Sequence, residues 1–79
     1  MDRPVFHATA SDVYWNAGGP SVLVTPDMLG QLTTDLTQEG IDAASMGDID
    51  SLRRSTRMLY ELRDAMASAR RWIEAARAA

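Results

Sequence analysis

The sequence of 79 residues contains no cysteine. This absence excludes a disulfide framework, a thiolate metal site and a cysteine nucleophile. Secreted proteins of this length normally depend on disulfides, so we expect a soluble, cytoplasmic protein. The sequence also has no run of about 20 apolar residues and no apolar signal segment at its start, so we expect no membrane partner.

Lysine is absent as well, since all eight basic residues are arginine. Such usage is typical of a GC-rich coding sequence, for example one from an actinobacterium or its phages. Residues 1–50 hold eight acidic residues and one arginine, whereas residues 51–79 hold seven arginines and three acidic residues. Two halves of opposite charge can attract each other within a hairpin or across a dimer, and an arginine-rich half can also attract nucleic acid.

Motifs that carry catalysis or bind a cofactor are lacking too. His7 is the single histidine, so a metal site would need carboxylate ligands at no recognisable spacing. His7, Ser11 and Asp12 are residue types of a hydrolytic triad, but they are too close in sequence to reach its geometry. Asp35 and Asp42 have no predicted cleft in which to act as acid and base. We therefore predict no catalytic residue, no metal, no cofactor and no enzymatic activity.

The first 25 residues are rich in β-branched and aromatic side chains, with glycine and proline between them. This composition predicts short strands over residues 5–9, 13–15 and 21–24, with "NAGGP" as the turn between the last two. Because side chains alternate sides along a strand, we expect Trp15 to pack over the helices and Tyr14 to face a partner.

Two helices are predicted to follow, over residues 26–46 and 48–78. Thr25 and Pro26 are a helix start signal, and the pair Gly47-Asp48 is a break at which a second helix can begin. Gly40 is a weak point inside the first helix. A break of two residues forces the helices to double back as an antiparallel hairpin. The predicted fold is therefore mostly α, a small α+β protein in one domain.

The second helix carries a heptad pattern: Leu52, Leu59, Met66 and Ile73 recur every seven residues, and Ser55, Leu62, Ala69 and Ala76 follow each by three. Met58, Ala65 and Trp72 widen this stripe, and we interpret Trp72 as a core residue. The stripe is too wide for one partner helix, so we expect two hairpins to form a four-helix bundle as a homodimer. The predicted interface residues are Leu52, Leu59, Leu62, Met66 and Ile73.

The arginines of the second helix allow three interpretations. They can form a solvated or oligomer-paired face, bind a protein, or bind nucleic acid. Our hypothesis is a non-enzymatic interaction module, a small regulator or adaptor that acts as a homodimer on one host or cognate protein. The alternative is a nucleic-acid-associated or antitoxin-like regulator. Candidate partner-binding residues are Tyr14, Tyr60, Arg63, Arg70 and Arg77.

Overall fold

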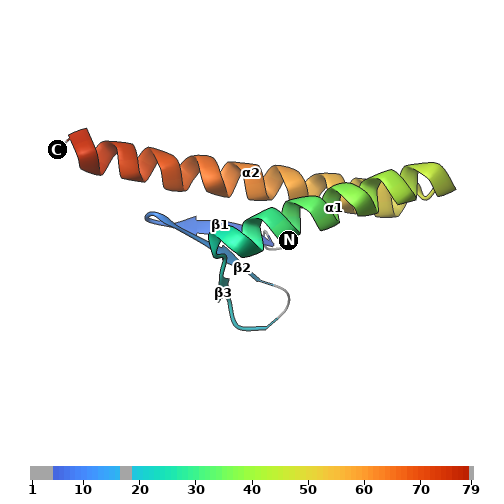
Figure 1. Ribbon diagram of the computed structural model, residues 1–79, viewed down its shortest axis with the longest axis horizontal. Helices are drawn as coiled ribbons and strands as arrows, with labels where there is room; N and C mark the ends of the chain where they lie inside the picture. The colour runs from blue at the N-terminus through green and yellow to red at the C-terminus, as the bar shows by residue number, and fades with distance from the viewer. Residues whose placement is uncertain (1–4, 17–18, 79) are drawn as a thin grey trace. The chain divides into compact units, whose positions relative to one another are not determined.

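The computed structural model describes residues 5–16 and 19–78 (Figure 1). In these residues a small antiparallel sheet precedes two helices. The elements in chain order are β1 (Phe6–Thr9), β2 (Asp12–Trp15), β3 (Val22–Leu23), α1 (Pro26–Met46) and α2 (Ile49–Ala78). The predicted fold class is confirmed to this extent: short strands, then a helical hairpin.

α1 begins after the predicted capping residue Thr25 and ends at the predicted break. The backbone N–H of Met28 donates to Thr25 Oγ1 at 3.3 Å, and Pro26 occupies the first turn, where its missing N–H costs nothing. The helix passes through Gly40 without interruption and ends at Gly47, whose φ of 71° is left-handed. The weak point at Gly40 therefore does not break the helix.

Asp48 caps the start of α2. Its carboxylate accepts hydrogen bonds from the Ser51 hydroxyl at 2.7 Å and from the Ser51 backbone N–H at 3.1 Å. These two hydrogen bonds, helped by the positive charge of Arg54, hold the pKa of Asp48 below its ordinary value. Because caps fix both ends of the two-residue link, the chain reverses between α1 and α2 as predicted.

The sheet has the order β1-β2-β3, and both pairs of strands are antiparallel. Its register places Phe6, Trp15 and Val22 in one row across the strands, and His7, Tyr14 and Leu23 in the next. Directly opposed side chains of an antiparallel pair lie on the same face, so the two rows face opposite ways. The expected alternation of Tyr14 and Trp15 is thus confirmed.

The turn between β1 and β2 was not predicted. Thr9 pairs with Asp12, so Ala10 and Ser11 form a two-residue hairpin turn. Ala10 has a φ of 53°, a left-handed conformation usually taken by glycine. The predicted turn "NAGGP" does connect two antiparallel strands, although its residues 17–18 lie outside the described part of the chain.

The chain divides into two compact units. Residues 25–60, called the hairpin unit below, contain α1 and the first part of α2. Residues 1–24 and 61–79, called the sheet unit, contain the three strands and the remainder of α2. Neither helix has, in the residues that the structure describes, an apolar stretch long enough to cross a bilayer.

Small residues form the helix contact of the hairpin unit. A Cβ atom at Gly40 would lie 3.8 Å from Leu52 Cδ1 and 3.9 Å from Ser55 Cβ, so the backbones approach closely there. Ser55 is buried and its hydroxyl donates to Glu39 Oε2 at 3.5 Å. Its place on the predicted packing face of the second helix is confirmed. Leu36 and Ala43 of α1 complete the buried set.

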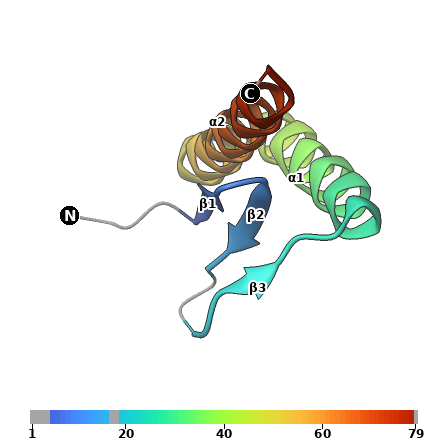
Figure 2. The same ribbon diagram turned by 90° about the vertical axis from the view of Figure 1, so that its left-hand side faces the viewer.

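In the core of the sheet unit, the aromatic ring of Phe6 packs with one leucine and two alanines of α2. The buried residues of this unit are Phe6, Leu62, Ala65 and Ala69. Phe6 stacks on Trp15, with the ring centroids 6.4 Å apart. The Val5 backbone N–H donates to Glu61 Oε2 at 2.9 Å, which joins the start of β1 to α2. Figure 2 shows β1 and β2 on one side of α2.

The interpretation of Trp72 as a core residue is wrong, because its side chain is 52% exposed. The buried residues of α2 end at Ala69, and residues 70–78 are all exposed. The heptad pattern gives the correct face of the helix, but a neighbouring element covers only part of that face.

Candidate interaction surface

An open groove of about 500 Å³ runs along the C-terminal part of α2 in the sheet unit. One side is Val13 of β2, and the other side is a single face of the helix. The helical positions are spaced by three and four residues, which places them in one row. The lining residues are Val13, Met66, Ala69, Arg70, Ile73, Glu74 and Arg77.

The groove combines apolar and charged side chains. Met66 is 37% exposed and Ile73 is 38% exposed, which is unusual for large apolar residues that lie on the packing stripe of a helix. Ala69 between them is buried. Arg70, Glu74 and Arg77 are exposed at the rim. The arrangement is a hydrophobic strip with both signs of charge beside it, which is a typical composition for a protein–protein contact.

Arg70 and Glu74 are four residues apart on α2, and the sequence suggests an ion pair between them. Among residues 5–16 and 19–78, no ion pair or hydrogen bond joins these two side chains. Both charged groups therefore lie next to the groove without a partner in the described part of the chain.

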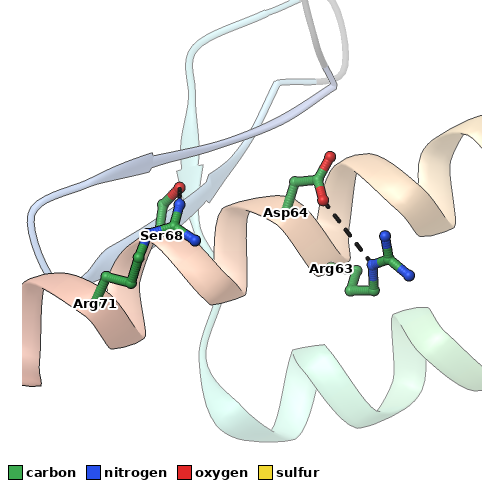
Figure 3. Close-up of polar contacts among 4 residues, drawn as sticks. All are labelled: Arg63, Asp64, Ser68 and Arg71. Atoms are coloured by element: carbon green, nitrogen blue, oxygen red, sulfur yellow. Dashed lines mark hydrogen bonds and ion pairs between the residues drawn. The ribbon is translucent and has the colours of Figure 1, made fainter.

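Arg63 lies in a different environment from the rest of its predicted row. Its Nε is 3.9 Å from Asp64 Oδ1, and both side chains are largely exposed (Figure 3). Such a surface pair contributes little to stability. Nearby, Arg71 Nη2 donates to Ser68 Oγ at 3.1 Å. Of the row Arg63, Arg70 and Arg77, only the last two line the groove.

The predicted interface residues fall into two groups. Met66 and Ile73 line the groove, whereas Leu62 is buried within its own chain and offers little surface to a second one. Leu52 and Leu59, in the hairpin unit, are half-buried. The C-terminal pair, Met66 and Ile73, therefore combines exposure with a place in the groove.

The two tyrosines differ in their surroundings. Tyr14 is half-buried and stacks on His7, with ring centroids 5.6 Å apart and planes inclined by 20°. Tyr60 is 54% exposed, as its outward position in the helical pattern predicts. Neither tyrosine lines the groove.

Two groove residues, Val13 and Glu74, were not among the predicted interface or partner-binding residues, and Ala69 was predicted on the packing stripe of the helix only. Val13 could not be found, because its contact with α2 depends on the strand register and on a chain separation of more than 50 residues. Glu74 carried a signal, its spacing of four from Arg70, but this was interpreted as a local pair.

His7 has no group of further metal-ligand side chains around it in the described part of the chain. Within residues 5–16 and 19–78, no three histidine or carboxylate side chains lie close enough together to hold a metal ion. The groove itself offers apolar contact and charge. Comparisons with protein-family models, with curated proteins and with solved structures give no match to this chain.

Proposed function

We propose that this protein is a non-enzymatic interaction module, a small regulator or adaptor that acts as a homodimer on one host or cognate protein. The observation that carries the proposal is the groove, in which Met66 and Ile73 are exposed beside charged side chains. Burying a large apolar side chain completely is worth about 1.5–3 kcal/mol, so a second chain that covers this strip gains free energy.

The small size of the domain also favours association, because it limits the core that one chain can bury. A domain of about 60 residues buries only about 60% of the surface that its unfolded chain exposes, and a chain of 79 residues is little larger. The described core consists of a few large side chains together with alanines and a serine. Association extends such a core without lengthening the chain.

Sedimentation velocity over a series of micromolar concentrations tests the homodimer. We expect a concentration-dependent dimer whose Kd rises about tenfold in Ile73→Gln, since loss of about 1.4 kcal/mol corresponds to a factor of ten. Ile41→Gln is the matched control, because Ile41 is the same residue type and is also exposed but belongs to the hairpin unit. A monomer at every concentration contradicts the proposal.

A nucleic-acid-associated or antitoxin-like regulator is the second candidate. The observation that favours it is the exposure of the arginines of α2: Arg53, Arg54, Arg57, Arg63, Arg70, Arg71 and Arg77. Its signature is retardation of duplex DNA that weakens steeply with salt. Absence of retardation at low salt removes this candidate.

A further inference from the structure

The groove also indicates how two copies would meet. We infer that two chains pack their α2 helices antiparallel over residues 66–78, with Arg70 of each chain paired to Glu74 of the partner subunit. This inference deepens the proposed function and rests on it, because it requires the homodimer.

The occupant follows from the charges beside the groove. A protein partner of one charge sign would satisfy either the arginines or Glu74 and would leave the other desolvated, which is costly. A second copy presents the same two signs on the same surface. Since Arg70 and Glu74 have no ion pair within the described chain, both are available to it.

The orientation follows from the order of the charges along the helix. In a parallel pair, Arg70 would lie beside Arg70 of the partner subunit, which is repulsive. In an antiparallel pair centred on residue 72, position 70 lies opposite position 74 of the partner. A two-fold axis then forms the same Arg70–Glu74 pair twice, and the opposed helix dipoles also favour this arrangement.

Apolar side chains lie on the same face of α2 as these charges. Residues 66–78 extend for roughly 20 Å along α2, at about 1.5 Å per residue. Met66 lies four residues before Arg70 and Ile73 lies three residues after it, so both flank the charge pair on that face. Covering Met66 and Ile73 removes their exposed apolar area from water.

A charge exchange tests this register with the full-length chain. We expect Arg70→Glu alone and Glu74→Arg alone each to weaken the homodimer about tenfold or more, because each replaces two attractive pairs by two repulsive ones. The double variant R70E/E74R restores the dimer. Mixing the two single variants in equal amounts produces a heterodimer, since positions 70 and 74 are then both acidic in one chain and both basic in the other. Arg53→Glu, an equal change of charge in the hairpin unit, leaves the Kd of the homodimer unchanged.

Sedimentation velocity of each variant and of the mixture gives the outcomes, and far-UV circular dichroism confirms that α2 remains helical. A wild-type dimer that both single variants preserve overturns the inference alone and leaves the proposed function intact. Single variants that dissociate but form no heterodimer on mixing overturn the antiparallel register. A monomeric wild-type chain overturns the proposed function and the inference together.

Discussion

In the hairpin unit two helices meet through Gly40, Ala43 and Ser55, whereas in the sheet unit the aromatic ring of Phe6 and short strands pack on α2. The two units differ in the length of the element that packs against α2. A strand of four residues spans about 13 Å, while 18 residues of helix span about 27 Å. The small sheet therefore leaves part of its helix face uncovered, and the groove with Met66 and Ile73 is the result.

The largest predicted effect breaks the core of the sheet unit. Leu62→Ala removes a side chain that is 2% exposed, so we expect a loss of about 2–5 kcal/mol in the free energy of unfolding. Urea denaturation at one fixed protein concentration measures it, with Trp15 fluorescence in a Trp72→Phe background reporting on the sheet unit. Leu23→Ala on the exposed β3 is the control and should cost much less. Equal losses for both variants would contradict the assignment of Leu62 to the core.

A second comparison concerns two glycines of the hairpin unit. Gly47→Ala should destabilise by about 1–2 kcal/mol, because the Cβ of alanine is sterically crowded at a φ of 71°. Gly40→Ala should stabilise by about 1 kcal/mol, since alanine favours the helix and its Cβ makes ordinary contacts with Leu52 and Ser55. Thermal unfolding monitored by circular dichroism measures both. Effects of the same sign in the two variants would show that one of these backbone assignments is wrong.

The third prediction concerns the tight turn of the sheet unit. Ala10→Gly relieves the left-handed conformation of Ala10 and should stabilise by about 0.5–1 kcal/mol, after allowing for the greater freedom of glycine in the unfolded chain. The midpoint of urea denaturation measures this change. Ser11→Gly is the control, because Ser11 has no positive φ. A destabilised Ala10→Gly variant would be inconsistent with this turn.

The smallest effect concerns the cap of α2 in the hairpin unit. The folded pKa of Asp48 is lowered, so its contribution to stability is complete above the ordinary aspartate pKa and is lost as the pH falls through the lowered value. We measure the free energy of unfolding between neutral pH and about pH 2. The part of its decrease with falling pH that comes from protonation of Asp48 should be absent in Asp48→Asn. NMR titration of the Asp48 carboxyl checks the direction directly, and an unshifted or raised pKa would contradict the cap.

Local signals predicted the helices well. Thr25-Pro26 and Gly47-Asp48 marked the ends of α1 and the start of α2 correctly, because capping depends on residues within one turn of the helix end. The turn at Ala10-Ser11 was missed because it contains neither glycine nor asparagine. Thus the helix ends could be predicted, because their capping residues are the usual ones. The turn could not, because its residues are unusual for a two-residue hairpin turn.

The groove required information that is not local. Periodicity identified Met66, Ile73 and the arginine positions on α2, but it could not show which part of the helix face the sheet covers. For this reason Trp72 was predicted to be a core residue, although its side chain is exposed in the structure. The opposite side of the groove, Val13, depends on packing between segments far apart in the sequence.

The chain order of the two units also has a consequence for folding. The hairpin unit is continuous in sequence, whereas the sheet unit is assembled from segments that precede and follow it. The hydrogen bond from Val5 to Glu61 joins residues 56 positions apart, so formation of the sheet unit closes a long loop at a cost in entropy. An early α1–α2 hairpin shortens that loop, and we expect contacts of the hairpin to form before β1 docks on α2.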